Sequence, residues 1–169
     1  GPDGRILLPG FYDQVRPLED WERQAFAALP FDEASFQAKL GVPSLEGEAG
    51  YTTVERKWAR PTCDINGLYG GYAGPGPKTV LPRTAGAKFS FRLVPDQEPS
   101  AIARSLRAHL ATHCPPGVTT ELIEYSAAPA VLVDTKSAGF QAAARAIEQG
   151  FGATPVYIRE GGSIPVVGL

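Results

Sequence analysis

The alternation of residues 87–93, "AKFSFRL", constrains the fold of this sequence more than any other feature. Its odd-numbered positions are apolar and its even-numbered positions are polar or charged: Ala87, Phe89, Phe91 and Leu93 against Lys88, Ser90 and Arg92. Successive side chains of a β-strand point to opposite faces, so this pattern predicts a strand with one face in a core and one polar face. The chain therefore needs a β-sheet with a layer over its apolar side.

Other segments carry helical or strand-like patterns. Apolar residues at helical spacing, with Pro or Gly at the ends, predict helices over 17–30, 100–113 and 137–152. The first helix has a predicted apolar face of Leu18, Trp21, Ala25, Ala28 and Leu29. A Gly- and Glu-rich connection is predicted over 40–51, and strands in "RPTCDINGLYGG", over 118–126 and from 154 to the Gly-Gly turn. This order predicts an α+β fold with an antiparallel sheet before residue 130.

Composition narrows the classes of partner and compartment. A formal net charge of -2 and a pI of about 5.7 argue against a general nucleic-acid surface. Residues 55–113 nonetheless carry nine Lys/Arg against four acids, an excess of +5 that suits either an anionic ligand or a solvated basic face.

No apolar run approaches the roughly 20 residues of a membrane helix. Cys63 and Cys114, without a CxxC, predict reduced thiols in a cytosolic protein, and the absence of methionine predicts a piece of a longer protein.

The stretch "GPGPKTVLP", residues 74–82, resembles a phosphate loop only superficially. A phosphate loop needs G-x-x-x-x-G-K-[ST], because successive backbone N–H groups converge on the phosphate oxygens. Pro77 stands where the last glycine is required, and proline has no N–H to donate. No helical pattern follows Thr79, and Pro82 forbids a long helix there. The pattern therefore argues against a nucleotide site.

Three further groups of residues resemble functional sites, but each also fits an ordinary structural role. His109 and His113 have the i, i+4 spacing of a metal-binding pair, but two ligands do not make a zinc site, and both suit the surface end of a helix. Ser163 in "EGGSIP" lacks the second glycine of a nucleophile elbow, although a glycine pair before serine suits a backbone nest for an anion. Arg92 either holds a carboxylate through two parallel hydrogen bonds or is an ordinary residue of the sheet surface.

Four stretches together carry a family resemblance: "GFYDQVRPL", "RPTCDINGLYGGYAGPGPKTVLP", "AKFSFRLVPDQEP" and "REGGSIPVV". In this order they resemble the dizinc metallopeptidases of the aminoacylase/carboxypeptidase type, in the branch of carnosinase-like, cytosolic non-specific dipeptidases. The resemblance covers nearly the whole chain. It implies the inserted lid of such an enzyme, which folds over the substrate and is also the dimerisation domain. The implied fold is an antiparallel sheet with helices on one face, followed by a short helix-strand return into the catalytic domain.

The resemblance also implies an organisation and a site. Residues 1–60 would be the N-terminal part of the lid, 61–130 its sheet, and 131–169 the return into the catalytic domain. Five residues match the family's grip on the substrate's C-terminal carboxylate: Thr79, Arg92, Gly161, Gly162 and Ser163. The longer enzyme would hold two divalent metal ions, zinc or manganese, whose ligands match no residue here, so none is expected to bind this segment.

The implied partners are a dipeptide and a second copy of the chain, paired through the lid in a cytoplasmic homodimer, with neither nucleic acid nor membrane. Two alternatives remain open. One is a non-catalytic α+β interaction module descended from such a lid. The other is an amidohydrolase or transferase of the same superfamily that acts on N-acyl amino acids.

The lack of a matching metal cluster predicts that this chain alone is inert. After loading with zinc, the isolated 169-residue chain should hydrolyse no dipeptide and should retain no stoichiometric metal in elemental analysis. Tight binding of one or two zinc ions per chain would contradict this prediction.

Overall fold

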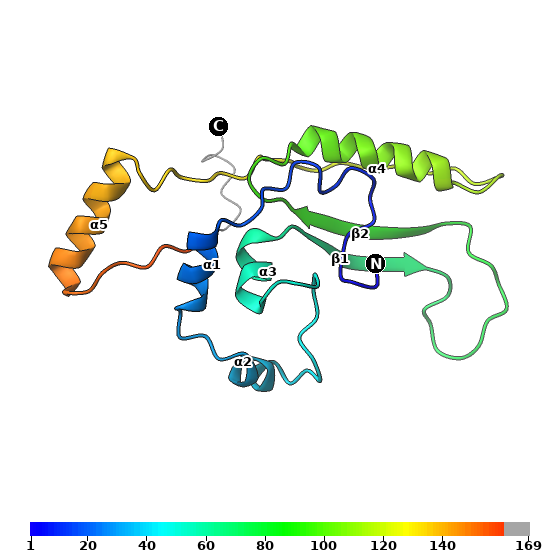
Figure 1. Cartoon of the computed structure of the whole chain (residues 1–169). Helices are drawn as coiled ribbons and strands as arrows, with labels where there is room; N and C mark the ends of the chain where they lie inside the picture. Colours follow the sequence, from blue (N-terminus) through cyan, green and yellow to red (C-terminus); the bar gives the residue numbers. More distant parts are fainter. Residues whose placement is uncertain (161–169) are drawn as a thin grey trace.

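The computed structural model describes residues 1–160 and confirms the α+β class (Figure 1). Within these residues the chain forms five helices and one two-stranded antiparallel sheet. The elements, in chain order, are α1 Asp20–Ala27, α2 Glu33–Leu40, α3 Thr53–Ala59, β1 Thr62–Gly70, β2 Ala85–Arg92, α4 Pro99–His113 and α5 Ala138–Phe151. Among these helices, none combines the length and the apolar character that crossing a bilayer requires.

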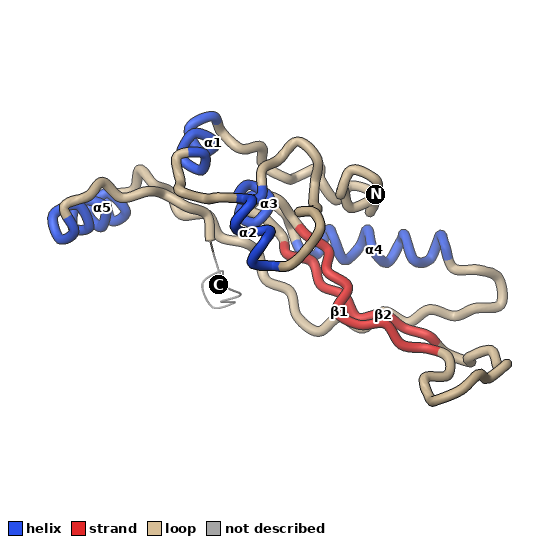
Figure 2. Tube along the Cα trace, turned by 90° about the horizontal axis from the view of Figure 1, so that it is seen from below, coloured by secondary structure: helices blue, strands red, loops and turns tan. Residues whose placement is uncertain are grey.

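The two strands form a long hairpin whose register determines where the candidate residues lie. Thr62 pairs with Arg92 at one end, and Gly70 pairs with Ala85 at the other, where the connection 71–84 begins. An irregularity between Ile65 and Gly67 interrupts the register, as a β-bulge does. Figure 2 shows the hairpin extending away from the α1–α3 region, with its connection at the distal tip.

The part of the alternating stretch nearest Arg92 packs against α4 and the N-terminal segment, as the alternation of residues 87–93 predicted, whereas Ala87 is exposed. Phe11, only 1% exposed, forms a core cluster with Leu8 and Ile102. Phe91 and Leu93 of the alternating stretch pack against this cluster, together with Leu106. Glu98 accepts a hydrogen bond from the Ser100 backbone N–H and so caps α4, which lies along the hairpin (Figure 1).

Helices α1 and α3 form a second small core. Its buried members are Leu18, Phe26, Val54 and Ala59. Both helices begin with a capping box, in which the cap and third-position side chains each bond to the other's backbone N–H. The apolar face predicted for the first helix was partly wrong, because Trp21 is 45% exposed whereas the charged Glu22 is buried.

Two predicted strands do not form within the described residues, and two helices form that were not predicted. No strand forms over 118–126 or over 154–160; a β-rich sequence becomes a strand only where a neighbour offers hydrogen-bonding groups. Glu124 instead forms an ion pair with Arg107 of α4. Helices α2 and α3 form where the sequence indicated no element. Both are short, and capping by Asp32 and Thr52 is the local signal that marks them.

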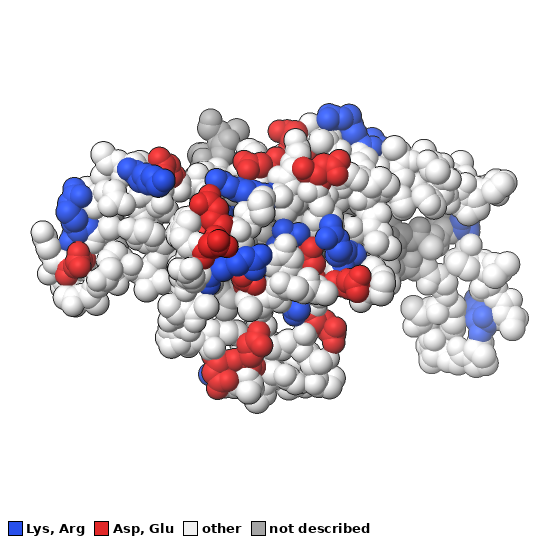
Figure 3. All heavy atoms as spheres, in the orientation of Figure 1, with Lys and Arg blue, Asp and Glu red and all other residues white. Residues whose placement is uncertain are grey.

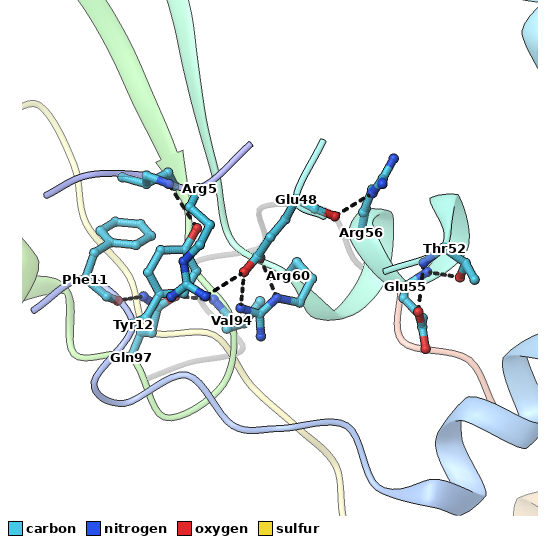
Figure 4. Close-up of polar contacts among 11 residues, drawn as sticks. Arg5, Phe11, Tyr12, Glu48, Thr52, Glu55, Arg56, Arg60, Val94 and Gln97 are labelled. Carbon is cyan, nitrogen blue, oxygen red and sulfur yellow. Dashed lines mark hydrogen bonds and ion pairs between the residues drawn. The ribbon is translucent and has the colours of Figure 1, made fainter. Parts of the chain in front are cut away.

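A buried ion pair joins the N-terminal segment, the loop before α3 and the start of β1 (Figure 4). Arg60 donates two hydrogen bonds to the Glu48 carboxylate, at 2.7 and 2.9 Å, and both side chains are buried. The Arg60 guanidinium lies 4.3 Å from the ring centroid of Tyr51 and 5.4 Å from that of Tyr12. Burial alone would lower the pKa of Arg60, but the hydrogen bonds and charge of Glu48 outweigh burial and raise it.

Glu48→Gln should destabilise the protein strongly, because it leaves the buried Arg60 charge without an anionic partner. Loss of one member of a buried pair costs about 3–5 kcal/mol in the free energy of unfolding. Denaturant unfolding of the variant measures this cost. The matched control is Glu124→Gln in the exposed Arg107–Glu124 pair, which should cost under about 1 kcal/mol. Equal costs for the two variants would contradict the prediction.

Candidate functional site

Thr79 lies in the connection between β1 and β2, an exposed loop with its own internal contacts. Every residue from 71 to 84 is exposed. The Tyr72 hydroxyl donates to the Pro75 carbonyl at 3.0 Å, and the Lys78 ammonium lies 5.2 Å from the Tyr72 ring centroid. Leu81, two residues beyond Thr79, is 93% exposed. A long connection that presents such an apolar residue to solvent is typical of a surface that contacts another molecule.

Arg92 occupies the opposite end of the hairpin. It is the last residue of β2 and lies across from Thr62, the first residue of β1. Directly opposed residues share a face of the sheet, so Arg92, Thr62, Asp64 and Ser90 belong to one polar face. Arg92 is exposed there, as the sequence pattern predicted, whereas Phe91 packs on the other side.

The structure does not bring Thr79 and Arg92 of one chain together. Strand β2 runs from Ala85, where the connection ends, to Arg92, which corresponds to about 23 Å at about 3.3 Å per residue. A carboxylate is only a few ångströms across. Two groups separated by the length of β2 therefore cannot both hold the same carboxylate within one chain.

The remaining predicted residues, Gly161, Gly162 and Ser163, lie outside the described residues. The two residues before them in sequence are placed, and both form ion pairs. Arg159 pairs with Glu22 of α1, and Glu160 pairs with Lys57 of α3 at 3.4 Å. Helix α3 ends at Ala59, just before the strand that begins opposite Arg92. The residue preceding the "GGSIP" stretch is thus anchored toward the Arg92 end of the hairpin and away from Thr79.

No metal centre can be assembled from the part of the chain that the structure describes. Residues 1–160 contain no group of three or more His, Cys, Asp or Glu side chains that could hold an ion. His109 and His113 stack with ring centroids 4.1 Å apart, and His113 Nδ1 lies 2.8 Å from the His109 carbonyl oxygen. Both thiols, Cys63 and Cys114, are free. The side chains of residues 1–160 therefore do not fit a two-metal centre.

Strand β1 combines an unpaired edge with exposed apolar side chains on the faces of the sheet, a feature that the sequence did not single out. In the described sheet β1 has only β2 as a neighbour, so its other edge is unpaired. Ile65, Leu68 and Tyr69 of β1 are all more than half exposed. An unpaired edge with exposed apolar side chains favours pairing with another strand. Alternation of apolar and polar residues, which predicted β2, would not have predicted this surface in residues 62–70, because the irregularity after Ile65 breaks the alternation.

These features define an α+β domain built for association: a hairpin with an open edge, covered on one face by a helix. Residues 18–118 match the family model of the M20 peptidase dimerisation domain, and the chain belongs to this family. The resemblance seen in the sequence is thereby confirmed.

Individual relatives agree with this assignment. The chain is 32% identical over 168 residues to the Cys-Gly metallodipeptidase DUG1 of Candida albicans, covering 96% of this chain and 34% of that protein. It is 30% identical over 166 residues to the human Beta-Ala-His dipeptidase, covering 96% and 33%. Among solved structures, the M20 family metallo-carboxypeptidase Sso-CP2 of Sulfolobus solfataricus matches with a TM-score of 0.80 at 30% identity, over 98% of this chain and 37% of that one. The chain thus spans about a third of the length of these relatives.

Proposed function

We propose that this chain is the lid and dimerisation portion of a metal-dependent dipeptidase and that it grips the C-terminal carboxylate of the substrate. The observation that carries the proposal is the alignment of 96% of the chain with two named dipeptidases. The match of residues 18–118 to a peptidase dimerisation domain adds support for the dimerisation role. The proposal includes a cytoplasmic location and the division into 1–60, 61–130 and 131–169.

Arg92 is the principal carboxylate-binding group in this proposal. Its guanidinium offers two parallel N–H donors, which match the two oxygens of a carboxylate in distance and direction. It lies on a polar sheet face, in the segment 55–113 with its excess of basic residues. On the face drawn in Figure 3, charges of both signs are interspersed over the α1–α3 region, whereas the hairpin tip shows basic charge and no acid. An anionic substrate group therefore meets no repulsion from the connection that carries Thr79.

A dimer resolves the separation of Thr79 and Arg92. Because both match the family's carboxylate grip but lie at opposite ends of β2, we place Thr79 of one subunit beside Arg92 of the partner subunit. Exposed Leu81, two residues beyond Thr79, would give the loop an apolar contact with the partner. Exposed Ile65 and Leu68, on the sheet face that they share with Phe89 and Ala87, supply further apolar area for an association through the unpaired edge of β1. Each site of the dimer would then contain groups from both chains.

The chain's contribution to catalysis is orientation. Two divalent ions, zinc or manganese, belong in this proposal to parts of the longer protein outside this chain, since residues 1–160 offer no ligand set. A carboxylate held at a fixed point restricts where the scissile amide lies. Such orientation can lower the activation free energy by several kcal/mol. The likeness to a metallo-carboxypeptidase favours a second candidate, an enzyme acting on longer peptides or N-acyl amino acids, because these substrates also end in a free carboxylate. A substrate panel of both types separates the two.

Arg92→Ala in the full-length protein should lower kcat/KM for dipeptides with a free C-terminus. A hydrogen-bonded contact to a charged group is worth about 1.5–3 kcal/mol, which corresponds to about tenfold to hundredfold or more. Arg92→Lys should recover only part of the loss, because an ammonium lacks the planar fork. Thr79→Val should cost less than Arg92→Ala, because it removes one neutral hydroxyl. Steady-state kinetics on each variant measures these effects.

The control for this experiment is the matched substrate amidated at its C-terminus. It presents no carboxylate, so Arg92→Ala should affect it far less. Circular dichroism verifies that the variant is folded. Equal slowing of free-acid and amidated substrates in a folded variant would mean that Arg92 is structural.

Mixed dimers test whether the site is shared between subunits. Thr79→Glu places a negative charge against the substrate carboxylate, so this variant and Arg92→Ala should each be poorly active as homodimers. In a heterodimer of the two, one site carries both substitutions and the other carries neither. Activity should therefore return to about half that of the wild type, as measured on heterodimers purified through two different tags.

The outcome differs if Thr79 and Arg92 serve the same subunit's site. Every site of the heterodimer then carries one substitution, and activity stays at the level of the homodimeric variants. That result would refute the shared site while leaving the carboxylate-binding role of Arg92 intact.

A further inference from the structure

Gln97 is a buried polar side chain that joins the end of β2 to the N-terminal segment (Figure 4). It is only 3% exposed, and both ends of its amide form hydrogen bonds. Oε1 accepts the Val94 backbone N–H at 3.0 Å, and Nε2 donates to the Phe11 carbonyl at 2.8 Å. Because one group accepts and the other donates, an ionised carboxylate or an apolar side chain at this position could not form both bonds.

The chain turns at residues 94–97, so that Gln97 folds back on the strand that it follows. The Gln97 backbone N–H donates to the Val94 carbonyl at 3.2 Å, which closes a four-residue turn. Pro95 is the second residue of this turn, and Asp96, the third, has a φ of +74°. A positive φ at the third position is typical of a type II turn, where glycine or asparagine is usual. The left-handed conformation of Asp96 is strained, and the buried hydrogen bonds of Gln97 offset this strain.

Arg92 lies between two contacts that both involve Phe11. On one side, the ring centroid of Phe91 lies 5.3 Å from that of Phe11, which is itself only 1% exposed. On the other side, Gln97 links the Phe11 carbonyl to the N–H of Val94, two residues beyond Arg92. Two residues span at most about 7 Å, so the backbone of Arg92 cannot move far while both contacts are intact.

The strand ladder gives Arg92 little support of its own. Arg92 is the last residue of β2, where it pairs with Thr62, and the described sheet provides β2 with a neighbour on one edge only. The ends of such elements open more readily than their centres. The contacts of residues 93–97 therefore determine where the end of β2 lies.

We propose that Gln97 is a positioning residue for Arg92, because it holds the end of β2 at the place where the guanidinium meets the substrate carboxylate. This inference rests on the proposed function, which assigns the carboxylate to Arg92. Recognition through two parallel hydrogen bonds requires a defined direction of the guanidinium, so a small displacement of the strand end weakens it. Gln97 is buried and therefore acts through Arg92 rather than by contact with the substrate.

Hydrogen exchange of the full-length protein, followed by mass spectrometry, tests the hold on the strand end. Gln97→Met should make amides in peptides covering 90–97 exchange about tenfold faster or more, because it leaves two buried backbone groups unpaired. The matched control is Gln14→Met, since Gln14 also accepts a backbone N–H of this region, that of Glu98 at 3.1 Å, but is exposed. The control should leave the exchange unchanged. Unchanged exchange in Gln97→Met would overturn the proposal, and Gln97→Glu, which loses only the bond to the Phe11 carbonyl, replaces it if the methionine variant does not fold.

Kinetics on the same variants tests whether Gln97 acts through Arg92. Gln97→Met should raise KM for free-acid dipeptides several-fold with little change in kcat, and should leave amidated substrates nearly unaffected. Added to Arg92→Ala, the same substitution should lower kcat/KM no further, because both changes remove one interaction. A further loss in that background, or equal slowing of both substrates by Gln97→Met, would overturn the positioning role. Equal slowing of both substrates by Arg92→Ala is the separate result that refutes the carboxylate grip itself.

Discussion

The buried pair of Glu48 and Arg60 is the interaction on which the rest of the arrangement depends. Arg60 immediately precedes Pro61 and β1, so the pair determines where the hairpin leaves the helical layer. Tyr12 and Tyr51 both lie near the Arg60 guanidinium and bring the N-terminal segment and the loop before α3 to the same point. The position of β1 in turn sets the register of β2. The location of Arg92 therefore depends on an ion pair that lies outside the hairpin.

Local patterns in the sequence identified the elements whose formation depends on local interactions. The alternation through residues 87–93 gave β2 and its buried face, and the helical stripe through Ile102 gave α4. The same reasoning predicted a strand over 118–126 that does not form, because strand formation depends on a partner that can be distant in sequence. It placed Trp21 in the core, whereas the capping box turns Glu22 inward to Arg159. That contact joins distant parts of the chain, and periodicity carries no information about it.

The sequence proposed residues for the candidate site but carried no information about how they lie relative to one another. The resemblance gave Thr79 and Arg92, and the polar face of the alternating strand independently marked Arg92. Thr79 and Arg92 are close in sequence, and this alone would suggest that they are close in space. The hairpin register contradicts that suggestion, because it places the connection that carries Thr79 at one end of β2 and Arg92 at the other. Only the strand register, and not the spacing in sequence, shows that these two residues lie toward opposite ends of the hairpin.

A two-stranded hairpin is marginally stable in water without further support. Here one face of β2 is supported by Phe91 and Leu93 against α4, but the outer edge of β1 has no neighbour in the described sheet. Association through that edge would add the missing support and, in the proposed dimer, would also present the connection at the tip to the other subunit. Stability of the hairpin and delivery of Thr79 would then require the same contact. In the proposed dimer, a lone subunit would hold only part of the carboxylate site, so activity would depend on dimerisation through the geometry of one hairpin.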